Sequence, residues 1–379
     1  MKKIWICILC LISLLALGAC SSQSGGETAG SQPASEAATQ VQSQSSQDND
    51  EGTAEGQSVE TQSLETEADE SQEHVISEGA AVRVGSLKGP TSMGLVSLMD
   101  QNQKGESRQS YDFKMVTAAD ELVAAVSSGD VDIALVPANV ASVLYNKTEG
   151  KISVLDINTL GVLYVVESKD TIQSVSDLKG KTLYLTGKGT TPDYALQYVL
   201  SQNGLTTDDV TLEYKSEAAE VAAVLANDEN AIGLLPQPFV TVACNQNEKL
   251  HIALDLTEEW DKAQGEDGSQ LVTGVTIVRN DFLENNEEVV KTFLEESKTS
   301  VEFTNSHQDE AAELIVQQGI VEKAAIAKQA IPYCNITYID GEAMKTALGG
   351  YLSVLHKQDA QSVGGQLPGD DFYYISSEK

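Results

Sequence analysis

An alternation of short apolar runs and amphipathic helical stretches fills residues 81–278, and no other feature of the sequence constrains the fold as strongly. Runs of roughly four to eight apolar residues bounded by glycine, proline or asparagine are typical of buried strands. Strands that alternate with helices favour an α/β architecture. Further along, residues 287–355 carry almost continuous helical periodicity. We therefore expect an α/β protein whose C-terminal part is helical.

The strand–helix series is interrupted by a second series of the same kind and then resumes. The first series has expected strands at 81–85, 111–116, 132–136, 152–157 and 161–166, the second at 182–185, 210–214, 231–235 and 251–254, and the resumed unit at 272–278. Such a pattern implies two lobes joined by two crossings of the chain, which we place near 166–169 and 270–274. Lobe I then comprises 80–166 and 273–379, and lobe II comprises 167–272.

Residues 1–20 have the features of a bacterial lipoprotein signal. A short basic head precedes an apolar run at 4–17, which suits a signal peptide and is short for a membrane span. The sequence Leu17-Gly18-Ala19-Cys20 resembles a lipobox, in which the cysteine is acylated and becomes the first residue of the mature chain. We expect Cys20 to anchor the protein to the outer side of the bacterial cell membrane. The alternative is an ordinary secretory signal that contains a cysteine by chance.

Residues 21–79 are expected to form a disordered acidic tether. They are rich in Ser, Gln, Glu, Gly and Thr, contain almost no bulky apolar residue, and carry no Lys or Arg. Such a segment buries too little apolar surface to offset its ordering entropy. Repulsion between its carboxylates should also extend it. The tether would hold the folded domain clear of the membrane.

The charge and the reactive residues exclude several classes of function. The chain has a formal net charge of −33, which argues against binding to nucleic-acid phosphates. Beyond the signal, Cys244 and Cys334 have no metal-site spacing; they are more readily two buried thiols than a disulfide, although pairing stays open. The triplet Gly180-Lys181-Thr182 lacks the upstream glycine of a phosphate-binding loop. The histidines are scattered, and no serine elbow or cofactor signature is present.

Four stretches resemble, in their order along the chain, the bacterial solute-binding proteins of the nitrate/sulfonate/taurine type. They are Val82–Ser92 (VRVGSLKGPTS), Ser128–Ala141 (SGDVDIALVPANVA), Asp177–Pro192 (DLKGKTLYLTGKGTTP) and Gly233–Thr241 (GLLPQPFVT). The resemblance implies a type II periplasmic-binding-protein fold, a clamshell that closes on a small molecule by hinge bending. It also implies an ABC importer, with its permease and ATPase, as the partner. We expect a monomer that makes and breaks no bond.

Candidate ligand-binding residues lie where strands end and helices begin, because ligands of open α/β sheets bind beyond the carboxyl ends of the strands. Backbone N–H groups at helix N-termini favour polar or anionic groups there. A helix is expected at 140–145, with Asn139 as its cap. The candidates are Lys88, Gly89, Thr91, Ser92, Asn139, Gly189, Thr190, Thr191, Gln237, Thr273 and Gly274. Capping is the competing role for the hydroxyl and amide side chains, turn formation for the glycines, and solvation for Lys88.

The ligand itself stays open at this level. No arginine occupies any candidate loop, which departs from a strong sulfonate or nitrate clamp. A small polar or weakly anionic solute fits the hydroxyls, amides and lysines. Two other functions on the same fold remain as alternatives. One is a ligand sensor or surface-partner lipoprotein, and the other is a precursor-processing enzyme, such as a pyrimidine-precursor synthase or a menaquinone-pathway lyase.

Overall fold

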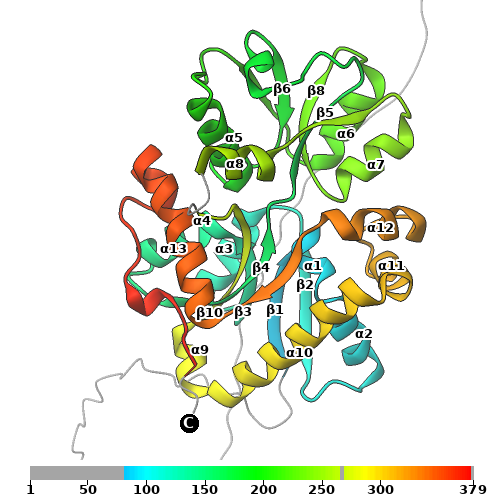
Figure 1. Cartoon of the computed structure of the whole chain (residues 1–379). Helices are drawn as coiled ribbons and strands as arrows, with labels where there is room; N and C mark the ends of the chain where they lie inside the picture. The colour runs from blue at the N-terminus through cyan, green and yellow to red at the C-terminus, as the bar shows by residue number, and fades with distance from the viewer. Residues whose placement is uncertain (1–80, 265–268, 377–379) are drawn as a thin grey trace, which may run out of the picture. The chain divides into compact units, whose positions relative to one another are not determined.

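A computed structural model describes residues 81–264 and 269–376; the predicted signal, Cys20 and the tether at 21–79 lie outside these residues. The described chain forms two α/β lobes, each built on one sheet (Figure 1). We call the lobe with the six-stranded sheet lobe I and the lobe with the five-stranded sheet lobe II. The α/β class predicted from the alternating pattern is confirmed.

The sheet of lobe I has the strand order β11-β4-β10-β3-β1-β2. Strand β1 runs parallel to β2 and β3, whereas β10 is antiparallel to both β3 and β4. The carboxyl ends of β1, β3 and β4 therefore lie at one edge, beside the start of β10. The strands are β1 (Val82–Leu87), β2 (Tyr111–Val116), β3 (Ile133–Pro137), β4 (Ile152–Leu160), β10 (Val272–Arg279) and β11 (Ile336–Ile339).

Helices cover both faces of this sheet, so the central strands β1, β3, β4 and β10 bury side chains on two sides. Helices α3 (Ala119–Ser128), α4 (Ala138–Lys147) and α13 (Gly341–Gln358) pack on one face. Helices α2 (Val96–Lys104), α9 (Asn280–Asn285) and α10 (Glu287–Ser306) pack on the other. Helices α11 (Gln308–Gln317) and α12 (Ala324–Ala330) form a separate hydrophobic cluster with α1 (Pro90–Met93) and the end of α10.

Lobe II repeats the same construction with the strand order β7-β6-β8-β5-β9. Strand β6 is parallel to β7 and β8, and β5 is antiparallel to β8 and β9. Helices α5 and α8 cover one face, and α6 and α7 the other. The elements are β5 (Leu163–Glu167), β6 (Thr182–Leu185), α5 (Thr191–Gln202), β7 (Thr211–Tyr214), α6 (Ala218–Asn227), β8 (Ile232–Pro236), α7 (Phe239–Gln246), β9 (His251–Asp255) and α8 (Leu256–Gln264).

The first crossing between the sheets lies earlier than the sequence predicts. The chain leaves lobe I after Leu160 and enters the sheet of lobe II at Leu163, so the apolar run at 161–166 belongs to lobe II. Its apolar pattern identifies a strand but carries no information on the pairing partner, which decides the lobe. The boundary of 166 for lobe I is therefore wrong. The return to lobe I reaches β10 at Val272, inside the range 270–274.

Strand β11 and helix α8 are among the elements that were not predicted from the sequence. Strand β11 (Ile336–Ile339) interrupts the helical region 287–355 and pairs with β4 at the edge of the sheet. Helix α8 (Leu256–Gln264) follows β9 directly. It carries Trp260, which is buried between Tyr198 of α5 and Tyr351 of α13, with ring centroids 4.5 and 5.5 Å away. This aromatic stack joins the two lobes through apolar contact.

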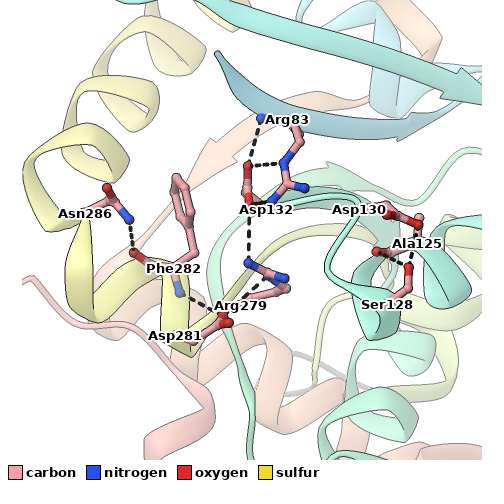
Figure 2. Close-up of polar contacts among 9 residues, drawn as sticks. All are labelled: Arg83, Ala125, Ser128, Asp130, Asp132, Arg279, Asp281, Phe282 and Asn286. Carbon is pink, nitrogen blue, oxygen red and sulfur yellow. Dashed lines mark hydrogen bonds and ion pairs between the residues drawn. The ribbon is translucent and has the colours of Figure 1, made fainter. Parts of the chain in front are cut away.

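An ion cluster around the buried Asp132 closes the end of the lobe I sheet that lies opposite the strand ends named above (Figure 2). Asp132 accepts hydrogen bonds from the backbone N–H and the Nε of Arg83, at 3.0 and 2.9 Å. Arg279, at the end of β10, lies 3.4 Å from the same carboxylate. Figure 2 also shows Asp281 beside Arg279. Two arginines are thus committed to one buried carboxylate, at a distance from the candidate residues.

The two cysteines in the described chain are free. Cys334 is fully buried and Cys244 partly so, and burial raises the pKa of both thiols. A disulfide between them is therefore excluded here, and the alternative of two unpaired thiols holds. Buried thiols of raised pKa are poor nucleophiles.

Candidate functional site

The first candidate loop of lobe I is held by the hydroxyls that the sequence singled out. Thr91 donates from Oγ1 to the Leu87 carbonyl at 2.9 Å, and Ser92 donates from Oγ to the same oxygen at 2.5 Å. Both side chains are buried. Gly89 has a φ of 145°, which favours glycine, and Lys88 beside it is exposed. The hydroxyls fasten the start of α1 to the end of β1 and do not cap the helix.

Gly274 allows α1, β4 and β10 to meet closely. A Cβ at this position would lie 2.6 Å from Asn158 Oδ1 and 2.9 Å from Thr91 Cγ2. Thr273 precedes it, and its Oγ1 is buried without a hydrogen-bond partner among the described residues. The return strand therefore brings a glycine and an unsatisfied hydroxyl to the strand-end edge of lobe I.

Asn139 connects the two lobes. It is the second residue of α4 and is fully buried, and Pro137 occupies the N-cap position, so the predicted capping role of Asn139 is wrong. Its Nδ2 donates to the carbonyls of Gly189 at 3.2 Å and Ser362 at 3.1 Å. Thr191 Oγ1 lies 3.5 Å from both Asn139 Oδ1 and the Thr273 carbonyl. Four predicted site residues, from both lobes, thus meet at one place.

The loop before α5 is organised by a residue that the sequence analysis did not single out. Asp193 is 4% exposed, and its Oδ2 accepts from the Gly189 N–H at 2.8 Å. Its Oδ1 accepts from Gln197 Nε2 at 2.6 Å and from the Tyr214 hydroxyl at 2.7 Å. Burial, and then the bond to Asp193, raise the pKa of Tyr214. Three donors hold this carboxylate in place.

Thr190 and Lys188 of that loop also make contacts within lobe II. Thr190 Oγ1 donates to the Gly187 carbonyl at 2.7 Å and makes no cap bond to α5. The Lys188 ammonium lies 5.3 Å from the centroid of the Tyr214 ring. The hydroxyl of Thr190 therefore stabilises the turn, and Lys188 makes a cation–π contact.

The side chain of Gln237 forms its hydrogen bonds within lobe II. Its Oε1 accepts from the backbone N–H of Thr241 at 3.2 Å and from its hydroxyl at 2.9 Å. The side chain is buried and satisfies the first turn of α7. The amide oxygen of Gln237 is thus committed to bonds within lobe II, and its role as a ligand-binding residue stays a prediction.

A hydrogen-bonded chain of buried polar side chains in β4 and β10, close to Gly274, was also not predicted from the sequence. Thr159 donates to Asn158 Oδ1 at 2.9 Å, and Asn158 Nδ2 donates to Thr276 Oγ1 at 3.1 Å. Thr276 in turn donates to Asp156 Oδ1 at 2.9 Å. Its signal in the sequence is the polar run Asp156-Ile157-Asn158-Thr159 at the end of an apolar strand.

Asp156 ends this chain as a fully buried carboxyl. Its Oδ2 has no hydrogen-bond partner among the described residues. Burial raises the pKa of Asp156 to about 7; the negative charge of Asp340 adds to the rise, and the bond from Thr276 opposes it. A carboxyl in this setting is held partly as the neutral acid near pH 7.

The chemistry available at this edge is hydrogen bonding by hydroxyls, amides and carboxyls. Within 81–264 and 269–376, no group of three or more His, Cys, Asp and Glu side chains is arranged to hold a metal ion. None of the helices in the same ranges has the length and hydropathy needed to cross a membrane.

Comparisons with solved structures identify the fold. An ABC transporter protein from Parabacteroides distasonis has a TM-score of 0.65 and 24% identity, covering 79% of this chain and 99% of that protein. The periplasmic aliphatic sulphonate binding protein SsuA of Escherichia coli has a TM-score of 0.60 and 15% identity, covering 80% and 95%. The two lobes thus have the periplasmic-binding-protein fold, as expected from the sequence.

The family is shown by the sequence itself. The NMT1/THI5 like family model matches residues 112–311, more than half of the chain. The protein belongs to this family. A Brucella abortus protein named as a binding protein is 21% identical over 256 residues, which span 67% of this chain and 76% of that protein.

Proposed function

We propose that this protein is an extracytoplasmic solute-binding protein that holds one small polar solute between its lobes and delivers it to an ABC importer. Lobe closure would trap the solute, and the closed form would dock on the permease. The described relatives support this proposal, because they include an ABC transporter protein and a periplasmic sulphonate binding protein.

One observation carries the proposal: residues of both lobes meet at the strand-end edge of lobe I. Asn139 of lobe I bonds to the Gly189 carbonyl of lobe II, and Thr191 lies within 3.5 Å of Asn139 and of the Thr273 carbonyl. These contacts are few and polar, so a solute with hydrogen-bonding groups can replace them at small cost. A bound solute would then bridge the lobes in place of the direct contacts.

The candidate ligand residues follow from this geometry. Asn139, Gly189, Thr191, Thr273 and Gly274 would face the solute directly. The remaining candidates of the first and second loops would support it by shaping those loops. No covalent step is proposed, and the solute would leave unchanged.

The proposed location depends on Cys20, which lies outside the described residues. Acylation of its thiol would hold the protein at the outer side of the cell membrane, with 21–79 as the tether. A monomer of this kind would remain close to its permease. The acidic charge of the chain would exclude nucleic acid as a partner.

The site is tested by the double variant Asn139→Ala/Thr191→Ala. A solute identified by a thermal-shift screen and supplied at about 100 times its dissociation constant should stabilise the wild type by about 2.7 kcal/mol. The double variant should lose most of this gain, because two of the groups that face the solute are removed. The free variant should lose about 1–3 kcal/mol of stability, since the Gly189 and Ser362 carbonyls lose their donor.

Asn245→Ala is the matched control. Asn245 Nδ2 bonds to Gln329 Oε1 at 2.9 Å and also links the lobes, but at an exposed position between α7 and α12. Its removal should leave the solute-induced stabilisation unchanged. If the double variant keeps the full gain, or if the control loses it equally, the proposed site is wrong.

A further inference from the structure

The start of α5 is where an anionic group of a solute would be expected to bind. Helix N-termini present free N–H groups and a favourable dipole to anions. The helix has twelve residues, and its preceding loop contacts lobe I through the bond from Asn139 to Gly189. This position is, however, already taken by the carboxylate of Asp193.

Three donors near the start of α5 are bound to that carboxylate. The Gly189 N–H, the Tyr214 hydroxyl and Gln197 Nε2 all converge on Asp193, at 2.6–2.8 Å. A carboxylate that accepts three hydrogen bonds and donates none fits the ionised form. Pro192, in the first turn, has no N–H, and the backbone N–H groups of Thr190 and Asp193 donate to carbonyls within the loop.

Among the described residues, no Lys or Arg forms an ion pair with Asp193. The arginines of the sequence are Arg83, Arg108 and Arg279. Arg83 and Arg279 contact Asp132 at the opposite end of lobe I, and Arg108 pairs with Glu295. Lys188 lies over the Tyr214 ring, and Lys88 is exposed. No guanidinium is therefore placed to bind an anion bidentately.

A simple capping role does not account for all of these contacts. An acidic residue in the first turn of a helix often accepts from a backbone N–H just before the helix, as Asp193 does from Gly189. Capping needs neither the Tyr214 hydroxyl nor Gln197, and it does not require burial to 4% exposure. By comparison, Asp177 accepts from the N–H groups of Gln173 and Ser174 in the same lobe and remains exposed.

We propose that Asp193 is a built-in anion that fills the anion position of lobe II and restricts the site to neutral or cationic solutes. The proposal rests on the solute-binding function proposed above and names its substrate class. A sulfonate or carboxylate at the start of α5 would meet the charge of Asp193 and find three nearby donors already occupied. A solute with an amine or other donor groups would meet no such repulsion.

Removal of the carboxylate should expose an anion site. In Asp193→Ala, the N–H of Gly189 and the side chains of Tyr214 and Gln197 are left facing a small buried space. We expect formate, at about 50 mM, to raise the melting temperature of this variant saturably, and calorimetry to show at least about tenfold tighter binding than to the wild type. Methanesulfonate should not bind the wild type saturably in the same range.

Two further variants test whether the gain of formate binding depends on loss of the buried Asp193 carboxylate. Asp177→Ala removes an exposed capping carboxylate of the same lobe and should gain no formate binding, because water replaces it. Asp193→Asn keeps the size of the side chain and removes its charge, and it should be destabilised less than Asp193→Ala. If Asp193→Ala does not fold, Asp193→Ser takes its place, because it also removes most of the volume of the carboxylate, and a saturable binding of formate is then required.

The outcomes separate this proposal from the proposed function. Saturable binding of methanesulfonate to the wild type overturns it, and so does a failure of the folded Asp193 variant to gain formate. Neither result depends on knowing the natural solute. The solute screen could find no solute while the Asp193 variant still gains formate binding. That result would count against the proposed solute-binding function and leave the proposed role of Asp193 intact.

Discussion

At the scale of single residues, the site is defined by carboxyls that the sequence does not mark as special. Asp156 and Asp193 are both buried, yet one ends a chain of donors and the other accepts three of them. Burial raises the pKa of Asp156, and the single bond that it accepts from Thr276 opposes this rise. The sequence indicates the candidate loops but not these roles, because the donors come from distant segments.

Asp156 should make stability depend on pH. Its pKa is raised to about 7 in the folded protein, against 3.8 for an unperturbed group, so the folded state retains a proton that the unfolded chain releases between these values. Stability is therefore lost as pH rises from about 4 to 7, by on the order of 1–4 kcal/mol. Asp156→Asn should remove this dependence, as measured by urea unfolding at several pH values.

The comparison between wild type and Asp156→Asn is needed because the chain carries many other carboxylates. Their titration affects both proteins equally and cancels in the difference. A difference in unfolding free energy that stays constant from pH 4 to 7 would contradict the burial-driven shift.

At the scale of helices and strands, the sequence predicts local structure well and pairing less well. The bounds of β2 and β6 agree with the predicted 111–116 and 182–185. Strand β5 was assigned to the wrong lobe, because its apolar pattern suits either sheet. Strand β11 was missed, since four residues at a sheet edge lie inside a helical region. The structure brings several candidate loops together, but the pairs of side chains that meet there depend on contacts between segments distant in sequence.

Helix α8 should contribute strongly to the contact between the lobes. Trp260 is fully buried between Tyr198 and Tyr351, and its Nε1 donates to the Ser269 carbonyl at 2.7 Å. Trp260→Ala should lower the unfolding free energy by about 3–5 kcal/mol, because it leaves a cavity between three helices. Chemical denaturation measures this loss. Tyr333→Ala, at an exposed aromatic of lobe I, should cost less than about 1 kcal/mol. Equal losses of unfolding free energy in the two variants would contradict a special role for the aromatic contacts of Trp260.

At the scale of the whole molecule, the proposed acylation of Cys20 would hold the binding domain at a membrane. Cys20→Ala should release the protein from the membrane fraction, because a thiol is needed for acylation. Fractionation of cells that express each form, with mass spectrometry of the mature N-terminus, measures this. A wild-type protein that is found without lipid, or a variant that stays with the membrane, would contradict the proposed anchor.

The central claim is that one unmodified solute binds per chain. The direct measurement is a calorimetric titration of the full chain with the solute selected by thermal shift, followed by recovery and chemical analysis of that solute. The account predicts a stoichiometry of about one and a solute recovered unchanged, neutral or cationic in charge. Conversion of the solute into a product would contradict it and indicate an enzyme on this fold. A stoichiometry near zero for every polar solute would instead indicate a surface protein that does not bind small molecules.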